Sequence, residues 1–146
     1  MGNMGPTVFS QALATRNVAV FVRVGSVMPM DRSATGWVFG TFISDGEYEL
    51  VFGSPRNSAP AALQDRFDTV RTEGCARITD EYVRGISAVA CPIFDIGNNI
   101  QAVVTALGPT GNFDNSLRGE IARILLESCA EISSSLGHTR QNTSPN

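Results

Sequence analysis

Basic side chains other than arginine are nearly missing from this sequence, which has no lysine and a single histidine, His138. The 11 positively charged residues are all arginines, and they are scattered singly along the chain. Because a nucleic-acid backbone is held by clustered positive charge, the chain is predicted to be a poor nucleic-acid binder on its own. A mechanism that needs a buried histidine base or several histidine metal ligands is likewise disfavoured.

Cysteines are few, and long apolar runs are absent. Cys75, Cys91 and Cys129 are odd in number and widely spaced, so they match neither a C-x-x-C metal motif nor a secreted disulfide scaffold. No apolar stretch approaches the ~20 residues that span a bilayer, and residues 1–16 lack the pattern of a secretory signal. We therefore expect a protein of the reducing cytoplasm without a membrane segment, a bound metal or a cofactor.

The length and composition predict one domain. With 146 residues, a net charge of -3 and 42% hydrophobic residues, the chain is near the common domain size and long enough to bury a core. Helix signals continue to Gly137, after which the sequence is polar. The domain is thus expected to cover residues 1–137, followed by a polar disordered tail over residues 138–146.

The first third of the chain predicts a strand hairpin followed by a buried helix. Two segments carry apolar side chains in partial alternation and are expected to be the strands: residues 7–13 and 17–24. Asp31 or Ser33 can cap the following helix, whose apolar positions cover most of its surface. Gly36 and Gly40 leave a bare stripe on that helix, where another backbone or a ligand can approach closely.

The middle of the chain predicts two helices. Residues 45–53 fit either a strand or a short helix, and the helix is favoured because Asp45 as the cap and Gly53 as the stop would frame it. A second, amphipathic helix is expected to be capped by Ser58 and to end at Gly74. Residues 75–77 should be a short extended piece, and residues 79–84 a polar loop.

The last part of the chain predicts a buried hairpin and a long helix. Residues 86–94 are almost wholly apolar, the pattern of a strand buried on both faces at the centre of a sheet. Turn residues at 95–98 join it to a second apolar run at 100–107. Asp114 is expected to cap a final helix that ends at Gly137. The stripe predicted to be buried on this helix consists of Leu117, Ile121, Ile124, Leu125, Ile132 and Leu136. These elements indicate an α+β domain with an antiparallel sheet.

The start of the helix after residue 32 is the best candidate for a binding site. Backbone N–H groups and the positive end of the helix dipole at Ser33, Ala34 and Thr35 would attract a carboxylate or a phosphate. The same pattern also fits a satisfied N-cap without a ligand. Thr105 is a polar side chain on an otherwise apolar strand, so it either faces a pocket or bonds back to its own strand.

Two groups of residues could be considered for catalysis. Cys91 could act as a nucleophile, but it stands in an apolar strand without a neighbouring histidine or lysine, which favours a buried structural cysteine. Asp80 and Glu81 form a carboxylate pair, although adjacent acids on a polar loop are usually solvated. The sequence therefore favours a binding protein over an enzyme.

Six short motifs follow one another in a definite order. They are RVGSVMPM at residues 23–30, SATG at 33–36, RTEG at 71–74, GISAVACPIFD at 85–95, LGP at 107–109 and a final helix ending in LG at 136–137. Together they resemble the effector-binding domain of IclR-family transcriptional regulators, and the resemblance runs from about Gly2 to Gly137. No single motif is decisive, but their order and spacing are fairly specific.

The resemblance implies a GAF-like, profilin-like fold, in which a curved antiparallel sheet carries helices on its faces. The first helix and strand of that fold are expected to be lacking here. In the family, a helix-start loop offers backbone amides to the carboxylate of a small organic acid, and this role falls on Ala34 and Thr35. The other positions that the resemblance assigns to the pocket are Thr79 or Asp80 at its rim and Ala88, Thr105 and Leu107 on its inner wall.

The resemblance also implies partners. Family members that sense small oxo-acids carry more polar side chains on the inner wall, so Ala88 and Leu107 favour a larger, more apolar acid, such as an aromatic one. Self-association as a dimer or tetramer is expected. DNA would be contacted only through an N-terminal winged helix-turn-helix that this chain does not contain, so the chain is expected to be shortened or read from a late start.

Two other functions fit the same residues. The first is a structural dimerisation module whose pocket is filled by Trp37, Phe42 and Leu107. The second is a small enzyme that uses Cys91 or Asp80.

Overall fold

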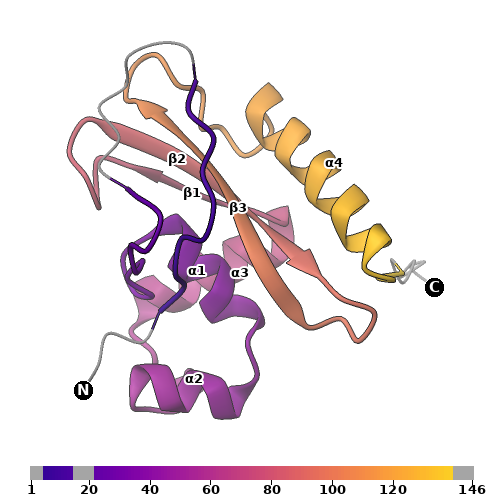
Figure 1. Ribbon diagram of the computed structural model, residues 1–146. Helices are drawn as coiled ribbons and strands as arrows, with labels where there is room; N and C mark the ends of the chain where they lie inside the picture. The colour runs from indigo at the N-terminus through magenta and orange to yellow at the C-terminus, as the bar shows by residue number, and fades with distance from the viewer. Residues whose placement is uncertain (1–4, 15–21, 140–146) are drawn as a thin grey trace.

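The computed structural model describes residues 5–14 and 22–139, and it contains four α-helices, one short 3-10 helix and three strands within those ranges (Figure 1). In chain order these are α1 (Ala34–Phe42), α2 (Asp45–Phe52), the 3-10 helix η1 (Arg56–Ser58), α3 (Ala61–Glu73), β1 (Ala76–Thr79), β2 (Ile86–Phe94), β3 (Ile100–Pro109) and α4 (Glu120–Ser135). The predicted strand over residues 17–24 lies mostly outside the described residues.

The sheet is antiparallel, with the order β1-β2-β3 in the described part of the chain. Ala76 of β1 is opposite Ala90 of β2, and Ala88 of β2 is opposite Leu107 of β3. The central position of β2 confirms the prediction from its apolar run, because seven of its nine residues are buried. The predicted α+β class with an antiparallel sheet is likewise confirmed.

Helices cover both faces of the sheet. On one face, α1 and α3 pack over a core that includes Trp37, Val70, Ala88 and Ala90. On the other face, α4 packs over the core residues that alternate with them, such as Val89 (Figure 1). Ala88 and Ala90 of β2 therefore face α1, whereas Val89, Cys91 and Ile93 face α4.

Close packing explains the glycine at the third position of α1. A Cβ atom on Gly36 would lie 2.2 Å from the carbonyl oxygen of Pro29 and 2.5 Å from the Cα atom of Met30. The preceding loop thus runs directly against the helix, as the bare stripe in the sequence suggested.

Residues 45–53 form the helix α2 and not a strand, so the favoured alternative is confirmed, but the N-cap is Ser44 and not Asp45. Ser44 and Glu47 make a capping box, in which the Ser44 hydroxyl accepts from the Glu47 N–H and the Glu47 carboxylate accepts from the Ser44 N–H. The Ser44 hydroxyl also donates to the Glu47 carboxylate at 2.7 Å, and this bond, together with the one from the Ser44 N–H, holds the pKa of the Glu47 carboxyl below its ordinary value. The helix ends at Gly53, which has a left-handed backbone with φ 72°.

Two further predicted helix starts are wrong. The N-cap of α3 is Pro60 and not Ser58, whose hydroxyl instead donates to the Pro55 carbonyl within η1. The N-cap of α4 is Gly119, and Asp114 accepts a hydrogen bond from the Ser116 N–H in the preceding turn. In both places a capping residue type closes a tight turn just before the helix.

The strand predicted over residues 7–13 is also not formed. Thr7 makes a single bridge with Val27, and beyond it the described chain to residue 14 is irregular. Phe9 is 80% exposed, so the partial alternation in this segment does not bury a face on the sheet. Alternation predicts a strand only where a partner face exists.

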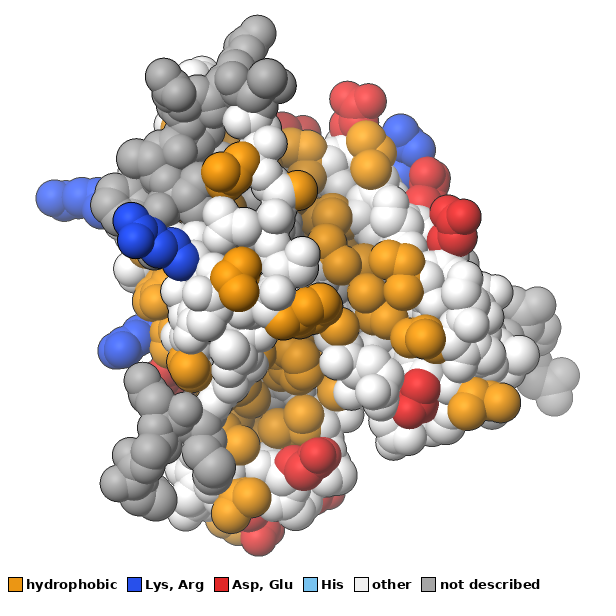
Figure 2. All heavy atoms as spheres, in the orientation of Figure 1, with side chains coloured by type: hydrophobic (Ala, Val, Ile, Leu, Met, Phe, Trp, Pro, Cys, Tyr) orange, Lys and Arg blue, Asp and Glu red, His pale blue; other side chains and the backbone are white. Residues whose placement is uncertain are grey.

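The predicted apolar stripe of α4 is correct only in part: Leu117 and Leu125 pack against the core, but the fully buried positions are others. The buried residues are Ala122, Cys129 and Ser133, whereas Ile124 and Ile132 are 48% and 43% exposed. Figure 2 shows hydrophobic side chains gathered on the face that carries β3 and α4. The helix therefore rests on the sheet through small side chains, with larger ones along its flanks.

The described chain remains packed beyond α4 as far as His138. The imidazole of this half-buried residue lies 5.4 Å from the Phe94 ring, centre to centre, and its Nδ1 is 3.2 Å from the carbonyl oxygen of Asp95. The histidine that the sequence placed in a polar tail is thus in contact with the end of β2.

Candidate functional site

Ser33 organises the start of α1. Its buried hydroxyl accepts a hydrogen bond from the Gly36 N–H at 2.9 Å and donates one to the Pro29 carbonyl at 2.6 Å. Ser33, and not Asp31, is therefore the N-cap of this helix. The cap satisfies one of the orphan N–H groups that every helix has at its first turn.

The amides of Ala34 and Thr35 are the remaining donors at this end. Among the residues that the structure describes, neither N–H donates to a backbone carbonyl or a side chain. They lie at the positive end of the helix dipole, beside a side-chain cap that already serves Gly36. This arrangement can hold an anionic group.

Thr35 and Thr105 join the helix to the sheet. Their hydroxyl oxygens are 2.8 Å apart, within hydrogen-bond distance, although 70 residues separate them in sequence. Of the two alternatives for Thr105, a bond back to its own strand does not describe this contact. Its partner is the first turn of α1.

Ala88 and Leu107 lie on the same face of the sheet as Thr105. They are opposite each other across β2 and β3, and both pack in the core that contains Ala34 and Trp37. The fold therefore brings six of the sequence-predicted residues together around the start of α1. They are Ser33, Ala34, Thr35, Ala88, Thr105 and Leu107.

Thr79 and Asp80 are not brought to this group. Thr79 is opposite Ser87, the residue next to Ala88 on β2. Because side chains alternate between faces, the Thr79 side chain lies on the face of the sheet away from Ala88. There its hydroxyl is 2.7 Å from the Nδ2 of Asn115. The Asp80 carboxylate accepts from the Gly85 N–H and the Thr110 hydroxyl, which closes the turn between β1 and β2.

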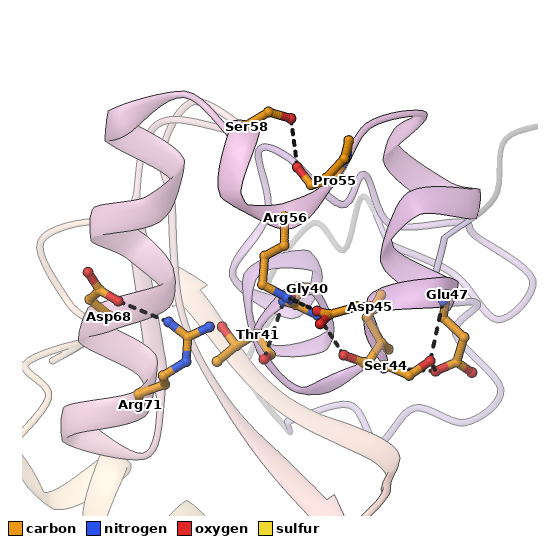
Figure 3. Close-up of polar contacts among 11 residues, drawn as sticks. Gly40, Thr41, Ser44, Asp45, Glu47, Pro55, Arg56, Ser58, Asp68 and Arg71 are labelled. Carbon is orange, nitrogen blue, oxygen red and sulfur yellow. Dashed lines mark hydrogen bonds and ion pairs between the residues drawn. The ribbon is translucent and has the colours of Figure 1, made fainter.

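A cavity lies at the other end of α1, between α2, η1 and α3. Its volume is about 420 Å³, and its lining contains both charge signs: Asp45, Glu49, Pro55, Arg56, Asn57, Gln64, Phe67, Asp68 and Arg71. Figure 3 shows Arg56 pointing toward Gly40 and Asp45, and Arg71 toward Asp68. None of these residues was singled out as a site in the sequence, because they become neighbours only through the packing of three helices.

The candidates for catalysis lack an activated group. Cys91 is fully buried, and a hydrogen bond with Cys75 together with burial raises the pKa of its thiol far above the ordinary value. Glu81 is paired with Arg66 at 3.0 Å, and the same guanidinium stacks 4.3 Å over the Trp37 ring. Asp80 is engaged in the turn described above.

The described residues contain neither a metal-binding cluster nor a helix that could cross a membrane. In residues 5–14 and 22–139, no group of three or more His, Cys, Asp or Glu is arranged to hold a metal ion. None of the helices in the same ranges is both long enough and apolar enough to cross a membrane.

Comparison with known proteins places the chain in a family. The family model described as bacterial transcriptional regulator IclR C-terminal matches residues 7–134. The crystal structure of Pseudomonas aeruginosa HmgR has 32% sequence identity and a TM-score of 0.82, and the match covers 96% of this chain and 58% of that one. No curated protein matches the sequence.

More distant structures share the fold. IclR of Thermotoga maritima matches with 24% identity and a TM-score of 0.74, over 87% of this chain and 55% of that one. The Agobacterium tumefaciens repressor BlcR matches with 19% identity and a TM-score of 0.68, over 85% and 54%. The chain thus spans under three fifths of the length of these proteins. It belongs to the IclR family of bacterial transcriptional regulators and corresponds to their C-terminal domain.

Proposed function

We propose that this domain senses a small carboxylate at the start of α1 and has no catalytic activity. The observation that carries the proposal is the pair of amides at Ala34 and Thr35, which lack a protein acceptor in the described residues and adjoin the Thr35–Thr105 hydroxyl pair. A carboxylate at this point would accept from the two N–H groups and gain from the helix dipole.

The side chains beside the amides favour an apolar acid. Ala88 and Leu107 offer hydrocarbon, and Thr105 is the one hydroxyl-bearing side chain among these three inner-wall positions. A very small polar acid would leave this surface unmatched, whereas an aromatic or branched acid would cover it. Ala34 and Trp37 are almost fully buried, with exposed fractions of 2% and 3%, so the site has little free space. A ligand would therefore need the half-buried Leu107 side chain to move outward.

Thermal unfolding in the presence of carboxylates tests this proposal. Benzoate and phenylacetate represent aromatic acids, and glyoxylate and acetate serve as small polar contrasts. A ligand at 100 times its Kd should stabilise the fold by about 2.7 kcal/mol, so a saturable rise in Tm is expected for aromatic acids. If none of a broad set of carboxylates raises the Tm of folded protein, the sensor proposal is wrong.

Matched threonine variants locate the binding site. Thr105→Val removes the hydroxyl beside the amides, whereas Thr110→Val removes one at the end of β3 that bonds with Asp80 and Ser87. Thr105→Val is expected to weaken ligand binding about tenfold, the effect of losing one hydrogen bond of ~1.4 kcal/mol. Thr110→Val should leave the affinity unchanged.

The remaining parts of the function follow from the family. We propose that the domain self-associates as a dimer or tetramer in the cytoplasm. Contact with DNA would belong to a separate winged helix-turn-helix of the whole regulator.

A structural dimerisation module is the second candidate. The observation that favours it is the tight packing at the proposed site, where Trp37 and the half-buried Leu107 and Phe42 fill the face of the sheet. In that case no acid would change the Tm, while sedimentation would show a dimer that Leu107→Ala weakens only through loss of stability.

A further inference from the structure

All three cysteines of the chain lie in one core cluster beneath α4, although 16 and 38 positions separate neighbouring ones in sequence. Cys75 follows the end of α3, Cys91 is in the middle of β2, and Cys129 is on α4. The sequence favoured a structural role for Cys91, and nothing in the proposed sensing function uses any of them. Their arrangement indicates a separate chemistry.

Cys75 and Cys91 are direct neighbours across two strands. Ala76 is opposite Ala90 in the antiparallel register of β1 and β2. One step further along this register places Cys75 opposite Cys91. Both side chains are on the α4 face and are fully buried.

Pairs of opposite residues in antiparallel strands alternate between hydrogen-bonded and non-hydrogen-bonded positions, and this alternation brings the Cys75 and Cys91 side chains close. The Asp80 N–H donates to the Ile86 carbonyl, which marks that pair as a hydrogen-bonded one. Every second pair is of the same kind, so Cys75 and Cys91 occupy a non-hydrogen-bonded position, where Cα atoms are about 4.5 Å apart and side chains are closest. A disulfide needs Cα atoms about 4.4–6.8 Å apart, a range that includes the usual spacing of such a pair.

The two thiols affect each other's protonation. Their side-chain interaction lowers the pKa of the Cys75 thiol and raises that of the Cys91 thiol. This is the pattern of a Cys91 thiol that donates to the Cys75 sulfur. The Cys75 thiol itself donates to the Glu73 carbonyl at 3.9 Å. Cys129 is engaged differently, because its thiol donates to the backbone carbonyl of Cys91 at 3.7 Å.

We propose that Cys75 and Cys91 are a redox modification site, which closes to an intramolecular disulfide when the protein meets a peroxide. The disulfide would tie the end of α3 to the central strand of the sheet. Because α3 packs against α1, this bond would stiffen the support of the proposed sensing helix.

The reaction is balanced by one peroxide for each disulfide. The Cys75 sulfur attacks a peroxide oxygen as its thiol proton is lost, and the O–O bond breaks. The products are a Cys75 sulfenic acid and water or an alcohol, in which the leaving oxygen carries the proton from the thiol. The Cys91 sulfur then attacks the Cys75 sulfur, the S–O bond breaks, and water leaves with the Cys91 proton. Two thiols are oxidised by two electrons in total, and the peroxide is reduced by the same two. A small dithiol reverses the change by disulfide exchange.

Intact mass measured without reductant tests the proposal. Native protein treated with hydrogen peroxide should lose about 2 Da, regain it after dithiothreitol, and yield one cross-linked peptide pair containing Cys75 and Cys91. An unchanged mass, a gain of oxygen without cross-linking, a cross-linked dimer, a pair containing Cys129, or closure only in denaturant would each overturn it.

Single variants supply the controls. Cys129→Ala keeps both partners and should still lose about 2 Da, whereas Cys75→Ser and Cys91→Ser should not. Loss of about 2 Da in either serine variant would contradict the assignment. Near-UV circular dichroism checks that each variant is folded, and if a serine variant is unfolded, the peptide map of the wild-type protein decides alone.

Discussion

The Nη2 of Arg56 donates a hydrogen bond to the carbonyl oxygen of Ile43, 2.6 Å away, and so closes the C-terminal end of α1. Its Nη1 also bonds to the carbonyl oxygen of Gly40, and its Nε pairs with Asp45 at 2.9 Å (Figure 3). A cation at this end complements the helix dipole and satisfies carbonyls that have no partner within the helix. The guanidinium also stacks 4.5 Å over the Tyr48 ring.

Arg56→Met should lower the free energy of unfolding by about 2–4 kcal/mol, because part-buried carbonyls lose a charged donor. Arg71→Met is the matched control and should cost less than about 1 kcal/mol, since within residues 5–14 and 22–139 the Arg71 side chain pairs with the exposed Asp68 alone. Urea denaturation of both variants measures the difference. Equal losses would mean that Arg56 does not hold the end of α1.

Ser33→Ala should lower the free energy of unfolding by about 1–2 kcal/mol through loss of the N-cap of α1. Ser58→Ala is the control, because Ser58 caps no α-helix and its exposed hydroxyl bonds within a turn. Its cost should be under about 0.5 kcal/mol. A larger loss for Ser58→Ala in urea denaturation would restore the helix start that the sequence suggested.

Gly36→Ala should be strongly destabilising, by about 2–4 kcal/mol, because its Cβ atom would collide with backbone atoms of Pro29 and Met30. Gly46 is also within a helix, but a Cβ there meets nothing within 4 Å. Gly46→Ala should therefore stabilise the protein by about 0.5–1 kcal/mol. Thermal unfolding should move in opposite directions for the two variants.

The hydroxyl pair at the proposed site predicts a coupled effect. Thr35→Val or Thr105→Val alone leaves one hydroxyl without its partner and should cost about 1–3 kcal/mol. The double variant removes both polar groups, so its cost should be well below the sum of the two single costs. Additive losses in a double-mutant cycle would show that the hydroxyls are not paired.

Asp95 predicts a pH-dependent contribution in the turn between β2 and β3. Hydrogen bonds, above all from the Asn99 N–H, hold the pKa of its carboxyl below the ordinary value near ~3.9. A lowered folded-state pKa gives stability that is present above the unfolded-state pKa and is lost as pH falls through the folded-state value.

Asp95→Asn should therefore flatten the dependence of stability on pH in the acid range below about pH 4. Wild-type and variant proteins should differ most near neutral pH and converge as the carboxyl becomes protonated. Urea denaturation at several pH values checks this, and a difference that grows toward acid would contradict it. Asp114→Asn is a useful comparison, since hydrogen bonds to Ser116 lower the pKa of that carboxyl too.

Short sequence patterns predicted those elements that are stabilised mainly by residues close in sequence, such as tight hairpins and capped helices. The β2–β3 hairpin follows from two apolar runs and a turn. Helix α2 follows from a capping residue and the Gly53 end, although the cap is Ser44 and not the predicted Asp45. By contrast, the helix starts at Ser58 and Asp114 were wrong because the same residue types also close turns.

Tertiary packing decided what local pattern could not. The face of α4 that contacts the sheet is the one with Ala122 and Cys129, since small side chains let the helix lie close to β2. The polar cavity at Arg56 depends on the approach of three helices and has no signature in sequence. Six residues of the predicted site do come together. Thr79 does not, because it is opposite Ser87 in the sheet and side chains alternate between the two faces, which places Thr79 on the opposite face from Ala88.

The alternating sizes on β2 fix how the strand can sit between its neighbours. A slip by one residue would turn Val89 and Cys91 toward Trp37 and leave the alanines beneath α4. Large groups would then collide where the indole already fills the space, and voids would open on the reverse side. Misaligned pairings are thus penalised twice, so the hairpin is protected against errors of alignment while the chain folds.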